Sequence, residues 1–184
     1  MADITVRVLE EDEWQLYRRT RLAALDDAPE AFVARFQDEA SYGDDVWRDR
    51  MKRARRLVAE LGDLPVGLVG LGLHEDDPET GEVLGLWTAP RARGEHVAWA
   101  LVSAAARKAA EDGCRMLYFW AGSDNAAAVG FASSFGFRPS GERRPVRVAD
   151  GGTEEDGDEE QADEVAMVLP LSVDSTQHAN PHPL

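Results

Sequence analysis

The sequence has no run of about 20 apolar residues, so it predicts no membrane-spanning helix and no membrane partner. Its first residues lack the basic and then apolar order of a signal peptide, and its single cysteine, Cys114, cannot form an internal disulfide. These absences favour a cytoplasmic protein. The 184 residues, of which 43% are hydrophobic, are enough for one domain, expected over residues 1–172.

Basic residues are few beside acidic ones: 20 Lys and Arg face 35 Asp and Glu, giving a formal net charge of −15. Such a surface repels phosphate backbones, which argues against a nucleic-acid partner. Part of the excess lies in residues 149–163, where acidic residues and glycine predict a mobile, solvated insertion. Attraction of a cationic substrate is the alternative role for this segment. The polar tail, residues 173–184, is predicted to be disordered.

The hydrophobic pattern predicts an α/β domain. In the first half, the predicted elements are a strand at 4–8, a helix at 11–27, a helical region at 29–54 with a break around 41–43, and a meander of antiparallel strands at 56–61, 65–74 and 82–88. In the second half, they are helices at 94–111 and 125–135 and strands at 116–120, 137–148 and 164–171. The order strand, helix, strand, helix implies a parallel crossover in the middle of the sheet.

One segment has the chemistry of a diphosphate site. Residues 86–101 read LWTAPRARGEHVAWAL, a predicted strand that turns through a basic loop of small residues into a helix. The first turn of a helix offers unpaired N–H groups and a partial positive charge to phosphate oxygens, and Arg91 and Arg93 add charge. Ordinary loop-to-helix connections have a similar composition, so the pattern alone leaves both interpretations open.

The same segment resembles motif A of the GNAT acetyltransferases, whose pattern is Gln or Arg, two residues, Gly, one residue, then Gly or Ala. It reads here as Arg93-Gly94-Glu95-His96-Val97-Ala98. The resemblance implies the GNAT fold, a mixed, mostly antiparallel, seven-stranded sheet flanked by about four helices, and acetyl-CoA as cosubstrate. Residues 93–98 would hold the pyrophosphate. Backbone groups of Leu86, Trp87 and Thr88 would hold the pantetheine arm and the acetyl carbonyl.

His96 departs from the family pattern, because it stands where glycine is usual. We expect the helix to accommodate it, since a β-carbon is tolerated in regular helical torsions, and its imidazole to donate a hydrogen bond to a phosphate oxygen. Weakened cofactor binding is the alternative.

Residues 125–137, NAAAVGFASSFGF, resemble the family's motif B, an Asn followed by a helix that ends in Gly-Phe. The resemblance implies that Asn125 hydrogen-bonds the cofactor arm, although Asn at this position also caps helices. Ala132 occupies the place of a tyrosine that often protonates the departing thiolate in the family. A thiol with a pKa of about 8.5 leaves tolerably without help, and water, Ser133 or Ser134 are other donors.

The acceptor amine must lose a proton before it attacks the thioester, because an alkylamine with a pKa of about 10 is mostly ammonium at neutral pH. Glu82 matches the position from which a glutamate acts as general base, often through water, in some histone-acetylating relatives. An exposed acid after a turn is the alternative interpretation. Direct attack needs no metal, and no Cys/His cluster in the sequence suggests one.

The acceptor would enter, by family analogy, between the first two helices and the loop joining the last two strands. Tyr17 and Phe32 are the candidate substrate-binding residues there, although their spacing equally fits core packing. The acidic excess favours a cationic amine on a small molecule or peptide. The sequence thus predicts an acetyl-CoA-dependent N-acetyltransferase, with a noncatalytic acyl-CoA-binding sensor or scaffold as the alternative. Dimers are common in the family, and the sequence does not decide between a monomer and a homodimer.

Overall fold

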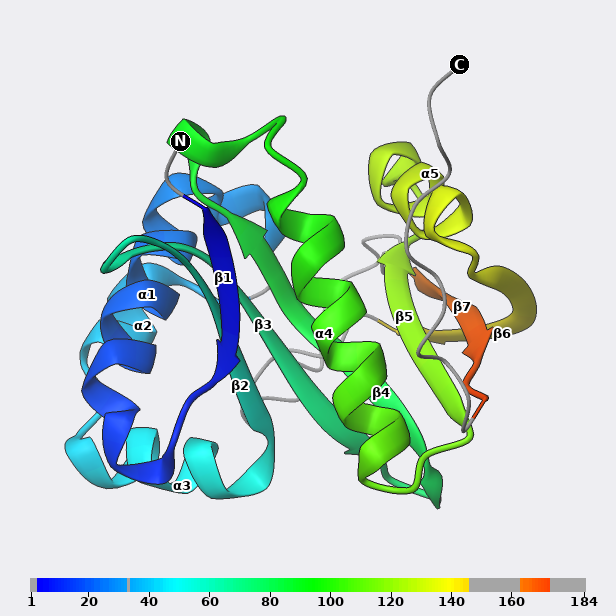
Figure 1. The fold of residues 1–184 in the computed structure, drawn as a ribbon, viewed down its shortest axis with the longest axis horizontal. Helices are drawn as coiled ribbons and strands as arrows, with labels where there is room; N and C mark the ends of the chain where they lie inside the picture. The colour runs from blue at the N-terminus through cyan, green and yellow to red at the C-terminus, as the bar shows by residue number, and fades with distance from the viewer. Residues whose placement is uncertain (1–2, 33, 146–162, 173–184) are drawn as a thin grey trace, which may run out of the picture.

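Figure 1 shows the computed structural model of the protein, which describes residues 3–32, 34–145 and 163–172. The strands are β1 (Ile4–Val8), β2 (Arg55–Leu61), β3 (Leu64–His74), β4 (Asp77–Thr88), β5 (Met116–Gly122), β6 (Arg138–Pro145) and β7 (Asp163–Pro170). The helices are α1 (Trp14–Asp27), α2 (Phe36–Ala40), α3 (Asp44–Arg53), α4 (Val97–Glu111) and α5 (Ala126–Phe135), with 3-10 turns η1 (Glu11–Glu13), η2 (Pro29–Ala31) and η3 (Pro90–Ala92). Except for Asp163, the predicted acidic insertion lies outside the described residues, as does the predicted tail.

The seven strands form one sheet in the order β1-β2-β3-β4-β5-β7-β6. Only the β4–β5 pair is parallel, so the predicted α/β class, the meander and the central crossover are confirmed. The predicted start of β4 at residue 82 was wrong, because the strand begins at Asp77, which pairs with His74. The acidic and proline residues that indicated a turn lie at the exposed end of this hairpin, where Asp77 accepts hydrogen bonds from the Glu79 N–H and the Thr80 hydroxyl.

Helices cover both faces of the sheet, and glycines in the strands allow them to approach. A β-carbon at Gly67 of β3 would lie 2.8 Å from side chains of Val97 and Leu101, so α4 packs directly on that face. On the opposite face, α1 and α3 enclose Trp47, which is fully buried. Helix α5 lies on the α4 side of the sheet, where its Phe131 contacts Phe119 of β5.

Strands β4 and β5 separate at the middle of the sheet. They pair only from Thr80 to Val83, and Figure 1 shows them diverging toward their C-terminal ends. A bulge in β4 accompanies the separation: Gly85 and Leu86 together oppose the single residue Val69, and Gly85 has a φ of 56°. Such a bulge bends the strand and ends its pairing, and a left-handed φ at this position favours glycine. The C-terminal half of β4, which carries Leu86, Trp87 and Thr88, is therefore free of β5.

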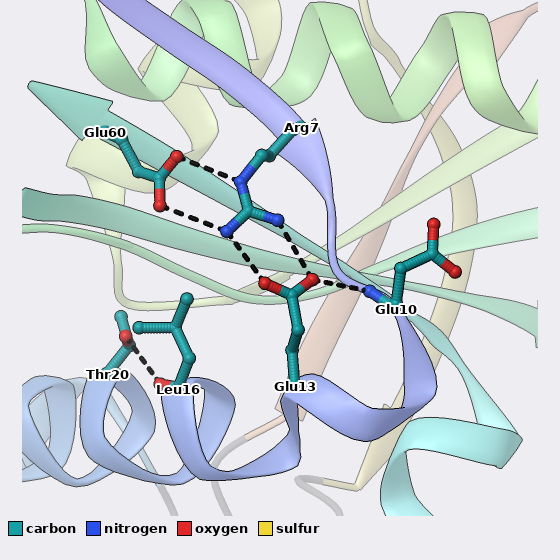
Figure 2. A network of polar contacts seen from close by, with 6 residues as sticks. All are labelled: Arg7, Glu10, Glu13, Leu16, Thr20 and Glu60. Atoms are coloured by element: carbon teal, nitrogen blue, oxygen red, sulfur yellow. Dashed lines mark hydrogen bonds and ion pairs between the residues drawn. The ribbon is translucent and has the colours of Figure 1, made fainter. Parts of the chain in front are cut away.

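The junction between β1 and α1 is held by one exposed arginine (Figure 2). Arg7 of β1 donates two hydrogen bonds of 2.9 Å to Glu13 and further ones to Glu60 of β2. Glu13 also accepts the Glu10 N–H at 2.8 Å, which fixes the entry into the helix. The hydrogen bond from Arg7 lowers the pKa of Glu13 below its usual range. The network sets where α1 begins relative to the sheet edge.

A second polar cluster is buried between α1, α2 and α3, each of which contributes one residue to it. The carboxylate of Glu39 is fully buried and accepts hydrogen bonds from Arg21 at 3.0 and 3.1 Å and from Arg50 at 2.9 Å. Burial by itself raises the pKa of Glu39, but the hydrogen bonds and charges of Arg21 and Arg50 outweigh burial and hold that pKa below its usual value. The short helix α2 is thereby tied to both of its neighbours.

We predict that Glu39→Gln lowers the free energy of unfolding by about 3–5 kcal/mol at pH 7, because it leaves buried guanidinium groups without their counter-charge. The deficit should shrink as the pH falls below about 4, since protonation of Glu39 removes the same charge from the wild type. Urea denaturation at both pH values measures this. Asp38→Asn, an exposed change one residue earlier, is the control, and equal effects of the two variants would contradict the prediction.

Candidate functional site

A cavity of about 380 Å³ lies where β4 ends and α4 begins, with α5 as its other wall. It is lined by Thr88, Ala92, Arg93, Gly94, His96, Val97, Ala98, Trp99 and Phe131. The predicted phosphate-binding segment thus contributes most of the lining. The structure brings Thr88 and the residues around His96 together, whereas Leu86, Trp87, Glu95 and Asn125 are outside the lining of this cavity.

The start of α4 presents free backbone N–H groups to this cavity. The first hydrogen bond of the helix joins the Ala100 N–H to the His96 carbonyl, so the N–H groups of Val97, Ala98 and Trp99 precede it. Among the residues that the structure describes, no side chain caps this end of the helix. Three unpaired donors at the positive end of a helix dipole, lining an open cavity, fit the phosphate groups of a coenzyme.

Two predictions about this segment were wrong. The helix begins at Val97 rather than residue 94, because Gly94 has a φ of 88° and the chain is still turning there. His96 does not have regular helical torsions: its φ of 59° and ψ of 20° are left-handed, and among the described residues it is the only non-glycine with positive φ. A left-handed conformation costs about 1–2 kcal/mol in a residue with a β-carbon, which explains why glycine suits this position.

We predict that His96→Gly raises the free energy of unfolding by about 1 kcal/mol, because glycine adopts the left-handed torsions without strain. His96→Ala keeps the β-carbon and should not gain stability. If the imidazole binds phosphate, both variants should lose about 3- to 10-fold in affinity for acetyl-CoA. Thermal melts and calorimetry measure the two effects. Equal stability of the variants would contradict the strain, and unchanged affinity in both would remove the phosphate contact.

Asp27, the last residue of α1, connects the predicted phosphate-binding segment to β4. Its carboxylate accepts hydrogen bonds from the Trp87 indole N–H at 2.8 Å and from the guanidinium of Arg93. Arg93 also donates to the Thr88 carbonyl at 3.3 Å. Sequence reasoning missed this role, because Asp27 precedes a proline-containing turn and its residue type indicates only the end of a helix.

Asn125 has the structural role that was its alternative interpretation. Its side-chain oxygen accepts the Ala128 N–H at 3.0 Å and caps α5, while a contact with the cofactor arm stays a prediction. Ala132 is fully buried within α5. Of the two nearby serines, Ser134 donates its hydroxyl to the Phe131 carbonyl at 2.8 Å.

Glu82 is buried, with 6% of its surface exposed, so its interpretation as an exposed acid was wrong. One carboxylate oxygen accepts the Trp120 indole N–H at 3.1 Å and lies 3.5 Å from Arg144 Nη1 and 3.7 Å from His74 Nδ1. Arg144 also pairs with Glu164 at 2.8 Å. These partners come from β3, β5, β6 and β7, too far apart in the sequence for any local pattern to associate them.

The two candidate acceptor-binding residues have different environments. Tyr17 is 3% exposed and packs edge-on against Trp47, with their ring centroids 5.6 Å apart, which is core packing. Phe32 is half-buried beside the β4 bulge: its ring lies 4.7 Å below the guanidinium of Arg21 and 4.0 Å from the position of a β-carbon on Gly85. The structure therefore leaves Phe32 beside the divergent strands and places Tyr17 in the interior.

Two further properties concern membranes and metals. Of the helices that the structure describes, none is both long and apolar enough to cross a membrane. Within the same residues, no group of three or more His, Cys, Asp or Glu side chains is arranged to hold a metal ion.

Comparison with known families identifies the class. The profile of the Acetyltransferase (GNAT) family matches residues 9–137, which include both motifs and Glu82, and the chain belongs to this family. The resemblance drawn from motifs A and B is thus confirmed. Family membership also confirms acetyl-CoA as the cosubstrate and acyl transfer as the class of reaction.

Solved structures share this fold along nearly the whole chain. One is yncA of Salmonella typhimurium, described as an acetyltransferase and solved with its cofactor acetyl-CoA, with 20% identity and a TM-score of 0.65 over 99% of both chains. A GNAT-family acetyltransferase from Streptococcus pneumoniae has 15% identity and a TM-score of 0.68, over 92% of this chain and 100% of its own. The ribosomal-protein-alanine N-acetyltransferase of Brucella melitensis has 20% identity and a TM-score of 0.63, over 91% and 99%. A comparison with curated proteins found no match.

Proposed function

We propose that the protein transfers the acetyl group of acetyl-CoA to a primary amine of a small molecule or peptide. The observation that carries this proposal is the cavity at the first turn of α4, beside a strand that has left its neighbour. The free N–H groups of Val97, Ala98 and Trp99 would bind the diphosphate. Backbone groups of β4 around Leu86 and Thr88, which have no partner on β5, would bind the pantetheine arm between the strands.

Attack by the amine on the thioester is direct in this proposal. The one cysteine is unsuited to act as a nucleophile, because Cys114 is 5% exposed and burial raises the pKa of its thiol. Glu82 is the base that accepts a proton from the amine, directly or through water. Glu82 lies on β4, the strand that leads to the bulge, and its carboxylate is held in place by Trp120 of β5 and Arg144 of β6.

The departing thiolate has no dedicated donor in this proposal. Ala132 lacks a proton to give and Ser134 is bonded to the helix backbone. A thiolate is a tolerable leaving group near neutral pH, so its protonation by water suffices. We also propose that the enzyme works in the cytoplasm, because its lone cysteine cannot form an internal disulfide of the kind common in exported proteins.

The proposed function is tested by release of free thiol from acetyl-CoA in the presence of a panel of amines, together with calorimetry of acetyl-CoA binding. We expect binding and amine-dependent thiol release. Binding without release from any amine would favour the noncatalytic sensor or scaffold. Absence of binding would overturn both.

We predict that Glu82→Gln lowers kcat/KM for an amine acceptor by about 100-fold or more at pH 7, because the ammonium form of the acceptor then lacks a base. The loss should be smaller near pH 10, where about half of an alkylamine is already neutral. Steady-state thiol release at both pH values measures this.

The matched control is Glu79→Gln, on the same strand with a side chain 57% exposed, which should leave the rate unchanged. A loss for Glu82→Gln that is equal at both pH values would assign Glu82 a structural role instead.

A further inference from the structure

Three arginines lie near one buried carboxylate on the sheet face opposite α4. Beside the β4 bulge, Arg21 and Arg50 donate hydrogen bonds to Glu39, and Arg56 lies close enough for the charges of all three to shift the pKa of its guanidinium. One carboxylate thus serves two guanidinium groups with a third beside them, in a protein whose formal net charge is −15. Positive charge is therefore concentrated beside the bulge, although the whole chain is acidic.

Arg21 brings this charge to the bulge itself. Two of its nitrogens are bonded to Glu39, and the third, Nη1, has no hydrogen-bond partner among the described residues. A β-carbon on Gly85 would lie 3.1 Å from this nitrogen. Gly85 is exposed although it belongs to a central strand, and the Arg21 side chain beside it is 13% exposed. Phe32 lies against the guanidinium at 4.7 Å and orients it.

Arg56 adds a further buried positive charge near Arg21 and Arg50. Its Nε atom is buried without a hydrogen-bond partner among the described residues, and its guanidinium lies 4.6 Å from the ring of Tyr17. Burial lowers the pKa of Arg56, and the charges of Arg21 and Arg50 lower it further. Tyr17 and Glu39 raise this pKa, but they do not outweigh the lowering. A second anion near the cluster would relieve this repulsion.

A group of opposite sign lies farther back along the same strand. Glu82 and Glu164 both pair with Arg144, and His74 lies 3.7 Å from Glu82, so this group carries a charge of about −1 when His74 is neutral. Glu82 precedes Gly85 by three residues of strand, a distance of about 10 Å. The acceptor side of β4 thus has a negative pole at Glu82 and a positive pole at Arg21, with the half-buried Leu84 between them.

We propose that the acceptor is a free amino acid or a similar small amino carboxylate, whose carboxylate binds Nη1 of Arg21 while its amine faces Glu82. This assignment rests on the proposed function and specifies its substrate. It replaces the cationic acceptor expected from the net charge, because two poles of opposite sign match a zwitterion, whereas a polyamine would be repelled by the guanidinium groups of Arg21 and Arg56.

The test compares each amino acid of a panel with its own carboxamide, which keeps the amine and the side chain and removes the anion. Thiol release from acetyl-CoA gives kcat/KM for both members of each pair. We expect at least one amino acid to be preferred over its amide by about 10- to 100-fold, as charged hydrogen bonds usually provide.

The variant Arg21→Gln should abolish that preference by lowering kcat/KM for the acid and leaving the amide nearly unchanged. Glu39 keeps its 2.9 Å bond to Arg50 in this variant, so the buried carboxylate stays paired. The matched control is Arg19→Gln on the same helix, an exposed arginine outside the cluster, which should keep the preference. Because the readout is a ratio, a partly unfolded fraction of the variant cancels.

Each outcome decides between the two proposals. Thiol release with amides or cationic amines but not with amino acids would overturn the acceptor assignment and leave the acetyltransferase function standing. A preference for acids that survives in Arg21→Gln would remove Arg21 from the site. No thiol release with any amine, despite binding of acetyl-CoA, would overturn the proposed function and the acceptor assignment with it.

Discussion

The separation of β4 from β5 is the constraint on which the rest of the site depends. Sheet strands normally satisfy each other's backbone groups, and here the parallel ladder stops at Val83. The bulge at Gly85 turns β4 away, and the chain then passes through η3 into α4. One local irregularity therefore exposes the backbone of β4 and places the free end of a helix beside it. Both are needed to hold a long coenzyme with a charged end.

Much of this arrangement could be predicted because it is local. Alternating and helical periodicities mark the strands and helices, and the segment from Arg93 to Ala98 carries its own phosphate chemistry. The torsions of His96 could not be predicted in this way. A histidine in the first turn of a helix and a left-handed histidine just before the helix look the same in the sequence. The turn at Gly94 decides between the two conformations for His96.

The charged residues were the least predictable part of the site. Glu82, Trp120 and Arg144 resemble ordinary surface or strand residues when each is considered alone, and only the sheet brings them together. Net charge is also a coarse guide to the acceptor, because it sums over the whole chain while a substrate meets only the groups beside it. Glu39 and Arg21 show the same limit: two charged residues of amphipathic helices indicate solvent contact, yet both are largely buried.

Helix α1 connects the separate parts of the site. Arg7 fixes its first turn to the sheet edge through Glu13, and Asp27 fixes its last residue to Trp87 and Arg93. Arg21 lies between these two anchors and faces the bulge. A helix held at both ends leaves little freedom for the guanidinium at its middle. The same element thus sets the distance between the predicted phosphate-binding segment and Arg21, so the proposed positions of donor and acceptor are coupled through one rigid helix.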